Sequence, residues 1–198
     1  MKLNIANKLT ILRIILVPVF MYFILVPVGD PLCSRWYAAL VFALAAVTDY
    51  LDGKLARGMN MVTDFGKFLD PLADKFLIFG ALLAICASPD YGYMLTSNVI
   101  ASTTVIFREL AVTSLRLVAS SSSERVVIAA SMLGKLKTCS QMLFVLVAIL
   151  EPVILNEETA LYQNHILAYA ALVLMTVMTL WSGIDYIKNY WKYLKPKD

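Results

Sequence analysis

Four aspartates between residues 49 and 74 have the spacing of a metal-binding site. Asp49 and Asp52 are three residues apart, and Asp70 and Asp74 are four apart. Side chains at these intervals lie on one face of a helix. Four carboxylates on two facing helices would repel one another unless cations lay between them. Oxygen ligands favour Mg²⁺ or Mn²⁺, and two such ions can clamp a phosphate and its leaving group.

The residues between the two aspartate pairs suit a phosphate ligand. Gly53 leaves room for a ligand to approach the helix, and Ala56 is small and lies one turn beyond Asp52. Arg57 can bind a phosphate through two parallel hydrogen bonds. The alternative, in which aspartates cap helix ends or pair with nearby lysines, explains a single aspartate better than four at matched spacing.

The composition predicts that these residues are carried by membrane-spanning helices. Hydrophobic residues make up 60% of the chain and charged residues only 16%, against roughly 25% charged in soluble domains. A spanning helix needs about 20 mostly apolar residues. We therefore expect an all-α, polytopic membrane protein with one domain over residues 1–198. Its six predicted transmembrane helices are 9–28, 36–57, 66–87, 98–118, 133–152 and 163–188.

The basic residues predict the orientation of these spans. If the spans alternate in direction, 16 of the 17 Lys and Arg residues lie toward one side, and only Arg35 lies toward the other. Because basic residues favour the cytoplasmic side, both termini and the four aspartates are predicted to be cytoplasmic. The alternative of a divalent-cation transporter would place carboxylates near the middle of the bilayer. The net charge of +3 is modest, and we expect no nucleic-acid partner.

The aspartate pattern resembles the signature of the CDP-alcohol phosphotransferase family. The matching sequence is Asp49-x2-Asp52-Gly53-x2-Ala56-Arg57-x8-Gly66-x3-Asp70-x3-Asp74, with no departure at any position. The resemblance implies a six-helix membrane fold, usually a homodimer, in a bacterial cytoplasmic membrane. It also implies an active site open to the cytoplasm and the lipid, where an alcohol displaces CMP from a CDP-linked lipid.

Looser similarities indicate one branch of that family. They lie in Asn4–Arg13, Arg108–Leu110, Leu115–Arg116 and Gly134–Thr138, the last followed by Gln141 and Met142. These segments are similar to bacterial members that join CDP-diacylglycerol to glycerol 3-phosphate, giving phosphatidylglycerophosphate and CMP. Inositol phosphate or phosphatidylglycerol as acceptor would use the same aspartates. Serine suits the basic residues of the chain less well.

Cations in the fourth and fifth predicted spans suit a phosphorylated acceptor. Arg108 and Arg116 are eight residues apart, within about 80° of each other around a helix, and Arg108 lies deep in its span. A charge at that depth suggests a functional site. Lys135 and Lys137 open the fifth span. In the alternative reading, Arg108 pairs with Glu109, Glu124 or an aspartate, and the lysines only set the topology.

The resemblance also implies individual roles. Asp74 takes the proton of the acceptor hydroxyl and shares metal binding with the other three aspartates. The contacts to CDP-diacylglycerol are Gly53, Ala56, Arg57 and Thr63, with further contacts from Asn7 and Thr10.

Overall fold

The computed structural model describes residues 5–26, 28–58, 64–121, 132–155 and 158–190, and for residues 49–58 it describes only the backbone. The described residues contain helices and no strand, which confirms the all-α prediction. The elements are α1 (Ile5–Leu25), α2 (Pro31–Gly58), α3 (Asp64–Ala87), the 3₁₀-helix η1 (Pro89–Met94), α4 (Leu95–Ser121), α5 (Met132–Ile154), the short α6 (Ala160–Gln163) and α7 (Ile166–Tyr190).

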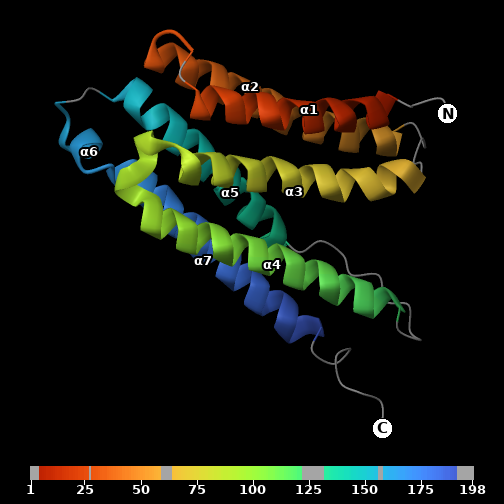
Figure 1. Cartoon of the computed structure of the whole chain (residues 1–198). Helices are drawn as coiled ribbons and strands as arrows, with labels where there is room; N and C mark the ends of the chain where they lie inside the picture. The colour runs from red at the N-terminus through yellow and green to blue at the C-terminus, as the bar shows by residue number, and fades with distance from the viewer. Residues whose placement is uncertain (1–4, 27, 59–63, 122–131, 156–157, 191–198) are drawn as a thin grey trace.

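The long helices alternate in direction and form two groups (Figure 1). Helices α1, α2 and α3 lie side by side in one group, and α4, α5 and α7 pack together in the other. Contacts of α2 with α5 and of α3 with α4 join the groups. One end of the bundle, called here the aspartate end, holds the start of α1, the end of α2 and the start of α3. The opposite end holds the α1–α2 turn, η1 and α6.

The helices are long and apolar enough for a membrane protein. Segments of α1, α2, α5 and α7 each meet the length and hydropathy of a span by themselves. Residues 68–87 of α3 and 89–118 of η1 and α4 meet these criteria only as a pair, which is bent by 93°. Charged residues such as Asp70, Asp74 and Arg108 lower the hydropathy of this pair. The described helices therefore give four spans, or up to five with the bent pair, and the count of six remains a prediction.

The helix ends differ from the predicted spans by a few residues, in both directions. Helix α1 begins at Ile5, before the apolar run that predicts the first span. It ends close to Gly29, whose φ of 73° favours glycine, and Pro31 then opens α2. Helix α2 continues to Gly58, through both Asp49 and Asp52. Asp49 and Asp52 therefore lie on α2, and Asp70 and Asp74 lie on α3, as the predicted spans 36–57 and 66–87 place them.

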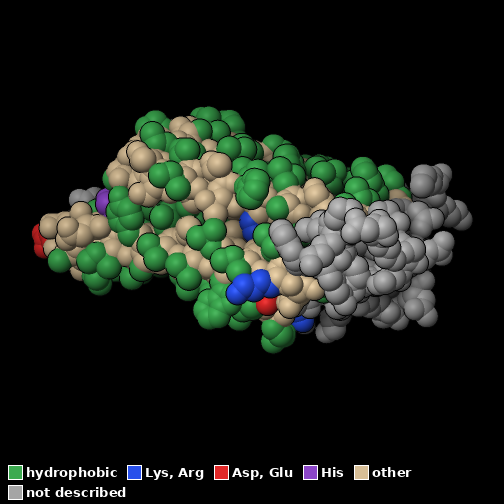
Figure 2. Space-filling model, turned by 90° about the horizontal axis from the view of Figure 1, so that it is seen from below, with side chains coloured by type: hydrophobic (Ala, Val, Ile, Leu, Met, Phe, Trp, Pro, Cys, Tyr) green, Lys and Arg blue, Asp and Glu red, His purple; other side chains and the backbone are tan. Residues whose placement is uncertain are grey.

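The core joins the two groups through apolar side chains. Phe20 of α1 packs on Phe42 of α2 with ring centroids 5.4 Å apart, and both side chains are fully buried. Leu77 of α3, Phe144 of α5 and Met175 of α7 belong to the same cluster. Hydrophobic side chains are spread over the whole described surface in the view of Figure 2, which suits lipid contact. A small group of basic side chains interrupts that surface toward the aspartate end.

Gly80 of α3 lies against α1, and a larger residue there is expected to destabilise the fold. A Cβ atom at Gly80 would lie 2.6 Å from Cγ1 of Val17, which is fully buried and β-branched. Gly80→Ala should therefore lower the free energy of unfolding by about 1–3 kcal/mol, the usual cost of overpacking. Thermal unfolding in detergent measures the change. Gly92→Ala is the control, because no atom lies within 4 Å of its added Cβ. Equal unfolding midpoints for the two variants would contradict the prediction.

Candidate active site

Helix α1 presents a buried polar face at the aspartate end. Asn7, Thr10 and Arg13 follow one another at intervals of three residues, so they share this face. Asn7 is 5% exposed, and Thr10 and Arg13 are fully buried. A fully buried arginine in an apolar helix indicates a functional site or a paired charge.

This face of α1 binds the two aspartates of α3. The Thr10 hydroxyl donates to Oδ1 of Asp70 at 2.9 Å. The Arg13 guanidinium donates through Nη1 to Oδ1 of Asp74 at 2.5 Å, forming an ion pair. Asp74 keeps 54% of its side chain exposed, so a ligand can reach its carboxylate. Helix α1 thus fixes one oxygen of each carboxylate while Asp74 remains accessible.

The other two aspartates lie on α2, which packs against both α1 and α5. Asp49 and Asp52 are three residues apart on a continuous helix, so they share a face. The structure describes only the backbone of residues 49–58, which include Gly53, Ala56 and Arg57, and Thr63 lies outside the described residues. The convergence of all four carboxylates therefore remains a prediction.

The described part of this cluster suits a divalent cation. Asp70 and Asp74 supply hard carboxylate oxygens one helical turn apart, of the type that Mg²⁺ and Mn²⁺ prefer. The contacts from Thr10 and Arg13 both use Oδ1, and they orient the two carboxylates from the α1 side. Such contacts to ligating side chains commonly fix the geometry of a metal site.

A second charged cluster lies between α4, α5 and α7. The carboxylate of Glu109 accepts hydrogen bonds through Oε1 from Arg108 at 2.9 Å and from Lys137 at 2.5 Å. Arg108 is 8% exposed and Lys137 is 5% exposed. Burial at this level makes a charge costly unless it is paired. The shared carboxylate therefore holds two cations side by side.

Helix α7 completes this cluster. The Ser182 hydroxyl accepts a hydrogen bond from Nη2 of Arg108 at 2.5 Å. The Tyr186 hydroxyl accepts one from Nη2 of Arg116 at 2.6 Å. The same tyrosine ring lies under both guanidinium groups, at 5.4 Å from Arg108 and 5.3 Å from Arg116. Three cations from two helices thus converge on one tyrosine and one glutamate.

Three of the four cations suggested for the acceptor are therefore brought together, namely Arg108, Arg116 and Lys137. Lys135 is exposed and lies on a different side of α5 from Lys137, which is buried. The contact between Arg108 and Glu109, which the sequence left as an alternative, is present. This ion pair is part of the cation cluster, because the same Glu109 carboxylate also pairs with Lys137.

Arg13, Ser182 and Tyr186 contact the two clusters, although no role is predicted for them from the sequence. Arg13 had a signal, because it is a cation within an apolar run. Ser182 and Tyr186 had none, because a serine and a tyrosine near the end of a span are common. Their contacts depend on how α7 packs on α4, which periodicity within one helix does not determine.

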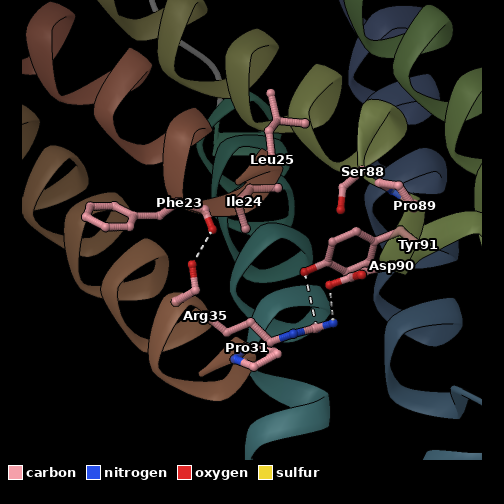
Figure 3. Close-up of a pocket in the computed structure, with 10 residues that line it drawn as sticks. Phe23, Ile24, Leu25, Pro31, Arg35, Ser88, Pro89, Asp90 and Tyr91 are labelled. Atoms are coloured by element: carbon pink, nitrogen blue, oxygen red, sulfur yellow. Dashed lines mark hydrogen bonds and ion pairs between the residues drawn. The ribbon is translucent and has the colours of Figure 1, made fainter. Parts of the chain in front are cut away.

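The opposite end of the bundle holds a different charged pair, beside a cavity of about 240 Å³ (Figure 3). Arg35 donates through Nη2 to Oδ2 of Asp90 at 2.9 Å, and its guanidinium lies 5.4 Å from the ring centroid of Tyr91. Ser34 donates to the carbonyl oxygen of Phe23 across the turn. No predicted site residue lines this cavity. The pair joins the start of α2 to η1. Substitutions in this pair are matched controls for substitutions of Arg13 and Asp74.

Comparison with known proteins agrees with the signature. The family model of the CDP-alcohol phosphatidyltransferases matches residues 3–181. A CDP-diacylglycerol–glycerol-3-phosphate 3-phosphatidyltransferase of Bacillus subtilis is 39% identical, over 97% of this chain and 97% of that protein. The protein of the same name from Escherichia coli K12 is 36% identical, over 94% of each chain. A probable phosphatidylglycerophosphate synthase of Mycobacterium tuberculosis H37Rv is 39% identical, over 93% of this chain and 80% of that protein.

The bundle with its aspartate signature belongs to a class of membrane-embedded transferases. The chain is a member of the CDP-alcohol phosphatidyltransferase family, whose model covers nearly all of it. This family generally uses a divalent metal ion.

Proposed function

We propose that the chain transfers the phosphatidyl group of CDP-diacylglycerol to glycerol 3-phosphate, with phosphatidylglycerophosphate and CMP as products. One observation carries this proposal beyond the family: the aspartate end holds the carboxylates of Asp70 and Asp74, and a separate cluster holds three cations, namely Arg108, Arg116 and Lys137. The first suits the diphosphate with its metal ions. The second suits the phosphate of a small acceptor, and the relatives named above carry this activity in their names.

The residues have distinct roles in this proposal. Asp49, Asp52, Asp70 and Asp74 would hold Mg²⁺ or Mn²⁺, two ions in all, which would neutralise charge on the diphosphate. Asn7, Thr10, Gly53, Ala56, Arg57 and Thr63 would bind the CDP-diacylglycerol headgroup. Arg108, Arg116, Lys137 and the more exposed Lys135 would bind the acceptor phosphate.

The reaction is a displacement at phosphorus. The acceptor hydroxyl oxygen bonds to the β-phosphorus of CDP-diacylglycerol, and the bond from that phosphorus to the oxygen of CMP breaks. Asp74 takes the hydroxyl proton, and Arg13 holds the other side of its carboxylate through Oδ1. Chemistry of this kind depends mainly on positioning and on neutralising charge.

The proposal includes a location and an assembly. The chain would lie in a bacterial cytoplasmic membrane, with both termini and the aspartate end toward the cytoplasm, as the distribution of basic residues indicates. Acyl chains of CDP-diacylglycerol would remain in the lipid beside the bundle. A homodimer follows from the family resemblance.

Competition between acceptors tests the proposed reaction. The purified protein receives CDP-diacylglycerol together with glycerol 3-phosphate, inositol phosphate and phosphatidylglycerol, first with Mg²⁺ and then with Mn²⁺. Lipid products are identified by mass spectrometry, and CMP release is measured. Phosphatidylglycerophosphate should dominate. A dominant product from another alcohol would refute the acceptor, and metal transport without CMP release would refute the reaction class.

Removal of the Lys137 charge is expected to weaken acceptor binding selectively. Lys137→Met keeps a long apolar stem in a buried position but removes the ammonium group. The KM for glycerol 3-phosphate should rise about 10- to 100-fold, as expected for a lost charged hydrogen bond. The KM for CDP-diacylglycerol should stay nearly constant. Lys188→Met, an exposed lysine on α7, is the control. Equal changes in both KM values would argue against a separate acceptor pocket.

A further inference from the structure

The last three turns of α7 carry the contacts that orient the arginines of α4. Tyr186 is 2% exposed, and both guanidinium groups lie over its ring. Its hydroxyl accepts the hydrogen bond from Arg116, which is itself an exposed residue. A buried tyrosine has few rotamers available, so it offers the exposed arginine a fixed partner.

Ser182 provides a second fixed point, one turn earlier on the same face of α7. It is fully buried and accepts the hydrogen bond from Nη2 of Arg108. Between them lies Gly183, at which a Cβ atom would be only 3.1 Å from Cγ of Arg108. Helix α7 therefore approaches the stem of Arg108 closely, and its two polar side chains face the two arginines.

We infer that Ser182 and Tyr186 are positioning residues, which set the direction and separation of the Arg108 and Arg116 guanidinium groups for the acceptor phosphate. This inference rests on the proposed acceptor pocket and extends it to a third helix. Neither residue needs to touch the acceptor. They act through the arginines, each of which would otherwise lose considerable side-chain entropy on binding a phosphate.

The charge of the cluster fits the same class of acceptor. Arg108, Arg116 and Lys137 carry three positive charges, and the carboxylate of Glu109 offsets one of them. The remaining charge of about +2 matches a phosphate monoester, which carries about −1.5 to −2 near neutral pH. Because Glu109 and Tyr186 hold the cations from opposite helices, the cluster is ordered before the acceptor arrives.

Tyr186→Phe tests the inference, because it removes only the hydroxyl and keeps the ring under both arginines. The KM for glycerol 3-phosphate should rise about tenfold, while the KM for CDP-diacylglycerol stays nearly constant. In a background of Arg116→Ala the same substitution should add almost nothing to the acceptor KM, because the arginine that the hydroxyl positions is gone. Tyr169→Phe is the control: it removes the hydroxyl that donates to the carbonyl oxygen of Tyr93 at the opposite end of α7.

Three results would overturn the inference. They are an unchanged KM for glycerol 3-phosphate in Tyr186→Phe, additive effects of the two substitutions, or a parallel rise of both KM values together with a lower unfolding midpoint. If Arg116→Ala alone leaves the acceptor KM unchanged, the proposed pocket fails, and the inference fails with it. If Arg116→Ala raises it and Tyr186→Phe does not, only the role of α7 fails.

Discussion

Asp74→Asn is expected to reduce kcat by at least about 100-fold, the range typical for loss of a general base. Asparagine has the same shape and keeps an oxygen that can accept the hydrogen bond from Arg13, so the local packing is preserved. It lacks the negative charge that would bind a metal ion and take the acceptor proton. The assay measures CMP release from CDP-diacylglycerol with glycerol 3-phosphate and Mg²⁺.

The matched control is Asp90→Asn, which also removes a carboxylate charge from an arginine pair. Asp90 is 55% exposed and pairs with Arg35 at the opposite end of the bundle. This variant should retain nearly full turnover. If Asp74→Asn kept more than about a tenth of the wild-type kcat, a loss too small for a missing base, the proposed role of Asp74 would be wrong.

Arg13→Met is expected to lower kcat about 10- to 100-fold, because a small misplacement of a catalytic group has an effect of that size. Arg13 is fully buried and holds Oδ1 of Asp74, which is otherwise more than half exposed. Methionine fills much of the same space with apolar atoms, and the carboxylate that it leaves without its arginine is 54% exposed, so that charge stays in contact with solvent. The unfolding midpoint should therefore change much less than the turnover.

Two comparisons make this test specific. Arg13→Lys keeps the charge but loses the planar guanidinium, and we expect a kcat between those of Arg13→Met and the wild type. Arg35→Met breaks the corresponding pair at the opposite end and should leave kcat nearly unchanged. A turnover of Arg13→Met above half of the wild-type value would show that Asp74 is oriented by other contacts.

The fold could be predicted largely from the sequence because helices depend on local pattern. The six apolar stretches correspond to α1, α2, α3, α4, α5 and α7, with ends that differ by a few residues. The ends were less predictable, since they depend on local hydrogen bonding as well as on the apolar pattern: α2 begins at Pro31, whereas its predicted span begins at residue 36. The 93° bend between α3 and α4 had only turn-forming residues as its signal.

The sequence by itself determined the aspartate signature and the chemistry that we propose for it. Spacings of three and four residues are fixed by one helix, so Asp70 and Asp74 share a face whatever packs against them. The same holds for the depth of Arg108 within its helix. These features depend on residue type and on distance along the chain, which the sequence contains completely.

Only the tertiary structure decided which side chains meet across helices. The pairing of Arg13 with Asp74 joins residues 61 positions apart, and that of Arg116 with Tyr186 joins residues 70 apart. It also separated the buried Lys137 from the exposed Lys135. Such contacts follow from the angle and register at which α1 packs on α3 and α7 packs on α4. The interdigitation of many side chains sets these quantities together, and no single motif in the chain encodes them.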